Sequence, residues 1–273
     1  MIKKLIKILS IILFLVTLII FYLSLVGVKT EIFNEKIKNK ISKINKNITL
    51  DLKGVRFLLD PYNFTVNIIT KNPTVLLEGN KLEIKEIKTN IFLKSLIFIG
   101  FSIENLKIET KSIKVEDLIL LARSFNNSTE LFLLDRMIKD GFLAADINLE
   151  FDERGGIKKN YQITGFTKNV KLNFLNKIKA NNLNFEFNIQ RNKYSLTKIK
   201  GDINEIKLSS PSIEVIKKKN LFLVEGKILS SKKEFDKNQF NILTTNFLKN
   251  QKIEKLIFNS ENDISFNLSN KLK

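Results

Sequence analysis

The sequence predicts a mainly β protein, with antiparallel strands, that carries one transmembrane helix near its N-terminus. Three observations predict this fold class: an uncharged apolar run over residues 8–28, alternation of apolar and polar residues through most of the rest, and few helical patterns. The chain has 273 residues, 44% of them hydrophobic, which is enough to bury a core.

The apolar run ILSIILFLVTLIIFYLSLVGV is the predicted membrane anchor. At 1.5 Å per residue a helix of this length is about 31 Å long, which matches the hydrocarbon thickness of a bilayer. A cleaved signal peptide is the alternative, but its apolar region is shorter and ends in small residues. Lys3, Lys4 and Lys7 precede the run, so we expect residues 1–28 to comprise a short basic cytoplasmic N-terminus and the transmembrane helix 8–28, with the remainder exported.

Residues 29–46 predict an amphipathic juxtamembrane helix. Phe33, Ile37, Ile41 and Ile44 recur at helical spacing, with lysines around them. Such a stripe fits either the lipid headgroups or the first strand of the following domain.

From Asn47 the period changes to two. Residues 47–115 predict a first β module, residues 116–140 a helical insertion, and residues 141–273 a long β region. We expect Gly141 to close the second inserted helix, Asp152 to Gly156 to form a hairpin turn, and Ser230 to Gln239 to form a linker. Separate strands are expected at 203–208 and 213–216.

Successive strands joined by short turns favour antiparallel pairing and leave one apolar sheet face to be buried. A second sheet, closure of the sheet on itself, or a bound apolar ligand would each bury it. Phenylalanine is abundant, with 22 residues, and composition by itself favours an ordinary core.

Little in the chain predicts chemistry. It has neither cysteine nor histidine, which excludes thiolate nucleophiles and removes the usual general base, so we expect no enzyme, no metal and no cofactor. The adjacent acids at 116–117 and 152–153 fit a helix start and a turn. The net charge of +18 is nearly all lysine spread singly along the chain, which indicates a solvated face rather than nucleic-acid binding.

The order of these segments resembles a known family. A basic anchor leads into EIFNEKIKNKISKI, then NITLDLKGVRF, DPYNFTVNIIT and LEIKEIKTNIFLKSLIFIGFSIENLKIETKSIKV. This series, between Lys29 and Val115, resembles the N-terminal module of the AsmA-like family, the group that includes TamB and YhdP. The later strands, from Asn169 to Ile228, are similar to that family's repeating strand region.

The resemblance implies a bacterial inner-membrane anchor and a periplasmic sheet curved into an open β-groove. It further implies phospholipid transfer toward the outer membrane, or maintenance of that membrane, with lipid acyl chains as partners. Family members that bridge the periplasm are generally longer. A dozen strands at about 4.8 Å spacing extend about 60 Å, so a short member would need a periplasmic or outer-membrane protein that extends the groove.

Two uses of the sheet follow as hypotheses: lipid binding in the groove, or scaffolding of outer-membrane proteins through strand-edge pairing. For the first, the predicted groove residues share the apolar parity of their strands: Phe64, Val66, Ile68, Ile147, Leu149, Phe151, Leu183, Phe185, Phe187, Ile189, Ile264, Phe266 and Leu268.

Overall fold

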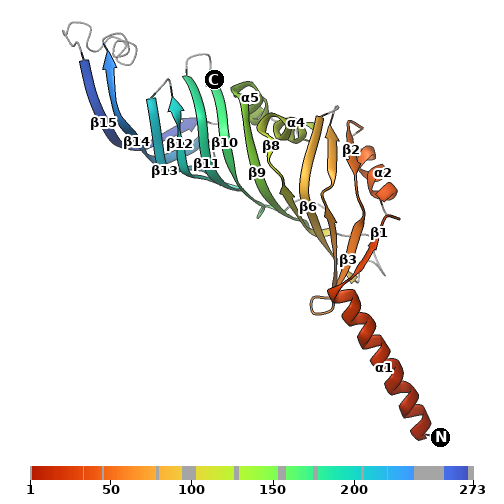
Figure 1. Cartoon of the computed structure of the whole chain (residues 1–273). Coiled ribbons are helices and arrows are strands. Elements are labelled where there is room, and N and C mark those ends of the chain that lie inside the picture. Colours follow the sequence, from red (N-terminus) through yellow and green to blue (C-terminus); the bar gives the residue numbers. More distant parts are fainter. Residues whose placement is uncertain are drawn as a thin grey trace. The chain divides into compact units, whose positions relative to one another are not determined.

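The fold is known from a computed structural model, which describes residues 2–32, 34–44, 46–77, 80–93, 103–125, 129–152, 158–174, 178–203, 206–219, 221–236 and 255–269. It is mainly antiparallel β, with 64% strand in one open sheet, an N-terminal apolar helix and a few short helices (Figure 1). The predicted fold class is therefore confirmed. Along the sheet the strand order is β1-β3-β4-β6-β7-β9-β10-β11-β12-β13-β14-β15, with β2, β5 and β8 paired outside this path.

Helix α1, Ile2–Leu25, begins and ends earlier than the predicted span of 8–28. None of its residues is buried. Its length and composition are sufficient to cross a membrane, and a signal sequence near an N-terminus has the same features. Thr17 and Ser24 return their hydroxyls to the carbonyls of Leu13 and Ile20, which satisfies these polar groups within an apolar helix. Gly27, at φ +70°, follows the helix end in the left-handed conformation that commonly stops helices.

Two compact units make up the chain. The first comprises residues 1–113, 124–126 and 144–163, and the second comprises residues 114–123, 127–143 and 164–273. In the first unit lie α1, β1 (Val28–Thr30), α2 (Asn34–Ile44), β2 (Ile48–Asp51), β3 (Val55–Asp60), β4 (Thr65–Lys71), β5 (Thr74–Leu77), β6 (Asn80–Phe92), β7 (Ile103–Thr110) and β8 (Ile113–Lys114), although Lys114 is already assigned to the second unit.

The core of the first unit lies where β2, β5 and β6 pair. Ile48 and Leu50 of β2 face Leu77 and Val75 of β5, and Val75 in turn faces Leu82 of β6. Helix α2 contacts β2, so it covers the first strand of the module. The predicted juxtamembrane helix is thus shorter than residues 29–46, because Val28–Thr30 pair with β3 instead.

The helical insertion consists of α4 (Val115–Phe125) and α5 (Thr129–Met137), and β9 (Ile138–Glu150) follows directly. The prediction that Gly141 closes the second helix is wrong, because Gly141 lies inside β9. There its φ of +128° and the close approach of Val170, whose Cα would lie 2.6 Å from an added Cβ, require glycine. The predicted turn over 152–156 falls almost entirely outside the described residues.

The strands of the second unit are long: β10 (Gln162–Phe174), β11 (Ile178–Gln190), β12 (Lys193–Ile203), β13 (Ile206–Lys217), β14 (Leu221–Asp236) and β15 (Lys255–Ser269). The linker prediction is wrong for residues 230–236, which continue β14, and residues 237–239 lie outside the described residues. Of the strands predicted at 203–208 and 213–216, Ile203 ends β12, while residues 206–208 and 213–216 lie in one strand, β13, because Pro211 occupies a bulge, where a missing N–H costs no ladder bond.

Residues with positive φ recur across neighbouring strands of this unit, and two of them lie in bulges. Asn169 of β10, Asn182 of β11 and Lys198 of β12 all have positive φ, between 52° and 54°. The pairing of β11 with β12 shifts register at Asn182 and at Lys198. Each bulge inserts one unpaired residue and increases the local twist, which bends the strands that carry it.

Candidate functional site

One face of the sheet in the first unit is apolar along whole rows of paired residues. Residues that pair directly across antiparallel strands point to the same side of the sheet, so a row of partners can be followed from strand to strand. The longest such row begins in β1 and crosses five further strands. It comprises Val28, Phe57, Ile68, Thr89, Leu106 and Leu149. A second row comprises Thr70, Ile87, Ile108 and Ile147.

These side chains are only partly covered. Phe57, Ile68 and Leu106 are half-buried, as are Leu149 and the isoleucines of the second row, and Val28 is 47% exposed. A sheet face packed against a second layer would bury such residues fully. Among the described residues, this part of the apolar face is therefore only partly covered, whereas Ile91, which pairs with Val66 in a neighbouring row, is fully buried.

The second unit repeats this arrangement on β11 to β15. One row comprises Ile189, Tyr194, Val215, Val224 and Phe266. The next comprises Phe187, Leu196, Ile213, Gly226 and Ile264. Val224 is buried, but most of the others are half-buried and Phe266 is 44% exposed.

Phenylalanine is prominent on this face. The rings of Phe185 and Phe187, two residues apart on β11, meet edge to face with centroids 6.4 Å apart. Leu183 precedes them on the same side and approaches Gly201 of β12, so closely that an added Cβ would lie 2.5 Å from its methyl group. The three side chains form a continuous apolar strip along β11.

The bulges keep this face apolar where strict alternation fails. Leu196 and Ile199 are three residues apart on β12 and would point to opposite sides of a regular strand. The extra residue Lys198 restores their parity, so both lie on the apolar side. Asn182 does the same for Ala180 and Leu183 on β11.

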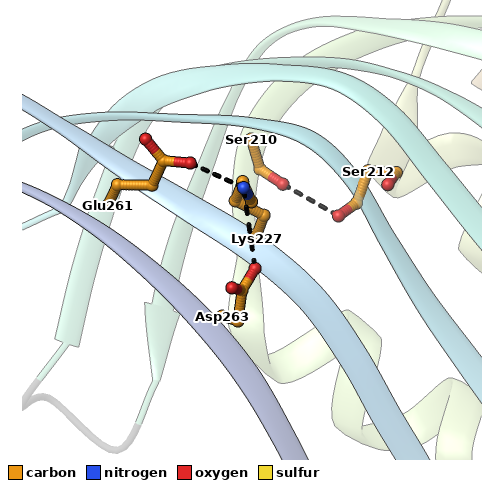
Figure 2. A network of polar contacts seen from close by, with 5 residues as sticks. All are labelled: Ser210, Ser212, Lys227, Glu261 and Asp263. Atoms are coloured by element: carbon orange, nitrogen blue, oxygen red, sulfur yellow. Dashed lines mark hydrogen bonds and ion pairs between the residues drawn. The ribbon is translucent and has the colours of Figure 1, made fainter.

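The opposite face of the second unit carries charge. Lys193 reaches Glu214 at 2.7 Å and Lys198 reaches Glu186 at 2.8 Å. Figure 2 shows a third group, in which Lys227 lies 2.6 Å from Glu261 and 3.8 Å from Asp263. The hydrogen bond from Lys227 to Glu261, with the charge of Asp263, raises the pKa of the Lys227 ammonium.

The same figure shows how the β13 bulge is held. The hydroxyl of Ser210 donates to the carbonyl of Ser212 at 3.0 Å, across Pro211. Ser210 is buried on the apolar side, so this bond satisfies a polar group that would otherwise lie unpaired among apolar neighbours.

Most of the predicted groove residues share these two faces. Val66, Ile68, Ile147 and Leu149 lie on the face of the first unit, and the β11 and β15 sets lie on that of the second. Phe151 follows β9 and donates its N–H to the carbonyl of Glu104 at 2.9 Å. Phe64 does not belong to the ladder: it lies in the turn before β4, 67% exposed and at φ +52°.

Sequence reasoning missed the partners that complete the rows: Phe57, Ile87, Leu106 and Ile108 in the first unit, and Tyr194, Leu196, Ile213, Val215, Phe222 and Val224 in the second. Phe222 and Leu268 face each other directly. Leu106 and Ile108, like Tyr194 and Leu196, are separated by one polar residue, and this alternation could have indicated that they share one side of their strand. The sequence does not show the register that aligns these strands with their neighbours.

Within the part of the chain that the structure describes, no three acidic side chains gather into a metal-binding cluster. No family model, curated protein or solved structure matches the chain. The AsmA-like resemblance therefore stays a prediction from the sequence, and the functional argument rests on the geometry of the two apolar faces.

Proposed function

We propose that this chain is a membrane-anchored lipid-binding protein whose open apolar faces hold acyl chains. The observation that carries the proposal is the pairing of half-buried apolar rows on one side of the strands with ion pairs on the other. Acyl chains would cover the apolar rows while the charged side stays in water.

The energetics suit a reversible carrier. Each methylene removed from water contributes about 0.8 kcal/mol, so seating about ten methylenes contributes about 8 kcal/mol before the cost of ordering the chain. Lipid bound by contacts of this kind is held without a specific headgroup site, and it slides along a row without breaking directional bonds.

The wider setting belongs to the same proposal. Helix α1 would anchor the chain in a bacterial inner membrane, with its basic N-terminus in the cytoplasm and the β units in the periplasm. The lipids would be phospholipids moving toward the outer membrane, in keeping with the resemblance to the AsmA-like family. A periplasmic or outer-membrane partner would extend the path.

Photocrosslinking tests the proposal in membranes of cells expressing the full chain. A benzophenone amino acid at Phe185 or Phe187 should crosslink to phospholipid, which mass spectrometry of the purified adduct would identify. Glu186, between them on β11, is exposed and points to the opposite side, so the same probe there is the matched control.

Equal crosslinking from Glu186 and its neighbours, or no lipid adduct at all, would rule out the apolar face as the binding surface. Adducts with protein instead of lipid would favour the scaffolding alternative. The scaffolding alternative would use β15, a strand of 15 residues. Among the described residues β15 is the last strand of the sheet and pairs on one side only, so its other edge could pair with a client strand.

A further inference from the structure

The turn between β3 and β4 lies beside the end of α1. Only Val26 and Gly27 separate α1 from β1, and Val28 of β1 pairs with Phe57 of β3. An added Cβ on Gly27 would lie 2.2 Å from the Phe57 carbonyl oxygen, so the two segments are in direct contact. Because β1 and β3 are antiparallel, the last residues of β3 run back toward α1, and the turn that follows Asp60 is level with the helix end.

This turn exposes two aromatic side chains. Tyr62 is 95% exposed and Phe64 is 67% exposed. Phe64 also has φ +52°, a left-handed conformation that is rare for a bulky residue and costs about 1–2 kcal/mol. A strained backbone that presents an apolar ring to water points to a partner for that ring.

The turn is held in one shape. The Asp60 carboxylate accepts hydrogen bonds from the side-chain Nδ2 of Asn63 at 2.9 Å and from the backbone N–H of Asn63 at 3.1 Å. These two bonds lower the pKa of Asp60. The carbonyl of Phe64 accepts the N–H of Leu93 at 2.9 Å. Tyr62 and Phe64 are therefore presented by a preorganised loop rather than by a loose one.

We propose that the β3–β4 turn inserts Tyr62 and Phe64 into the interface of the bilayer that α1 crosses. Tyrosine concentrates at this depth because its ring combines an apolar body with a polar hydroxyl, and a neighbouring phenylalanine adds apolar surface that the interface buries. The inference rests on the membrane-anchor part of the proposed function and is independent of lipid binding on the apolar faces. A second contact beside α1 would fix the first unit on the membrane, with the row that begins at Val28 starting at the lipid surface.

The chain has no tryptophan, so each single tryptophan variant reports its own position. Full-length Tyr62→Trp and Phe64→Trp would be reconstituted in three kinds of phosphatidylcholine nanodisc: without brominated lipid, with lipid brominated near the headgroup, and with lipid brominated deep in the acyl chain. Lys71→Trp, six residues beyond the start of β4 at Thr65, is the matched control. At 3.3 Å per residue it lies about 20 Å farther along the same strand. Phe14→Trp reports the middle of α1.

We expect blue-shifted emission from Tyr62→Trp and Phe64→Trp, with quenching by brominated lipid several-fold stronger than for Lys71→Trp. Quenching of Phe14→Trp by the lipid brominated deep in the acyl chain, without quenching of either turn variant by the lipid brominated near the headgroup, would overturn the inference and leave the anchor standing. Equal quenching of the turn variants and Lys71→Trp would overturn it as well. If Phe14→Trp itself is not quenched by lipid brominated deep in the chain, the anchor fails, and this inference fails with it.

Discussion

Single residues decide on which side of a strand the neighbouring apolar groups point. Lys198, at φ +54°, is the clearest case, because it inserts into β12 between Leu196 and Ile199 and keeps both on the apolar side. No Gly stands there, so the left-handed conformation is imposed by the pairing of β12 with β11 and β13 rather than by local preference.

Lys198→Val should destabilise the full chain more than Lys198→Asn, by about 1–2 kcal/mol, because asparagine tolerates positive φ and a β-branched side chain does not. Both variants lose the ion pair with Glu186, so that loss cancels in the comparison. Thermal or urea unfolding of the purified protein would measure the difference. Equal stability of the two variants would mean that the bulge is not formed.

At the scale of elements, strands differ in what their two sides carry. The ion pairs of β6, β7, β12, β13, β14 and β15 are exposed, so each contributes little to stability by itself. Their placement still has a consequence. A strand with lysine and glutamate on one side and phenylalanine and isoleucine on the other can turn only one side away from water.

Glu83 of β6 allows this to be tested with pH. Its carboxylate accepts a hydrogen bond from Lys111 at 3.1 Å and pairs with Lys81 at 3.2 Å. These contacts lower the pKa of Glu83, and the hydrogen bond from Lys111 contributes most. A lowered pKa stabilises the fold above the unfolded value of about 4.3, and that contribution is lost as the pH falls through the folded value.

We therefore expect Glu83→Gln to melt below the wild type at neutral pH, with the gap closing as the pH falls below about 4. Lys111→Met removes the partner that lowers the pKa of Glu83 most. The difference in melting temperature between this variant and the wild type should therefore close over the same pH range. Melting temperatures of the wild type and both variants, recorded from neutral pH down to about 3, test this. A gap independent of pH would show that Glu83 acts through packing rather than charge.

At the scale of the whole molecule, an apolar helix precedes two β units that each keep an apolar face partly open. The role of that helix decides whether the protein is tethered to a membrane or exported. If α1 stays on the chain as an anchor, the 273-residue chain expressed in cells and purified from membranes should keep its full mass of 31.6 kDa. Mass spectrometry showing loss of the segment before Val28 would establish a cleaved signal peptide instead.

Much of the β architecture could be predicted from periodicity. The β11 set of Leu183, Phe185, Phe187 and Ile189 alternates along one strand, and the structure places it on one side as expected. Ile264, Phe266 and Leu268 behave likewise. Phe64 lies in a turn rather than in β4, because alternation does not reveal a left-handed residue, and the gap expected between residues 208 and 213 is absent because Pro211 lies in a bulge of β13.

The sequence by itself determined the strand class, the apolar N-terminal helix and the two-sidedness of the strands, since each depends on the spacing of neighbouring residues. Only the tertiary structure decided which strands pair, where the bulges align, and that Val28 continues from the helix into the first apolar row. These depend on contacts between residues far apart in the chain. A shift of one residue in a register exchanges the apolar side for the charged one, and no local pattern specifies that register.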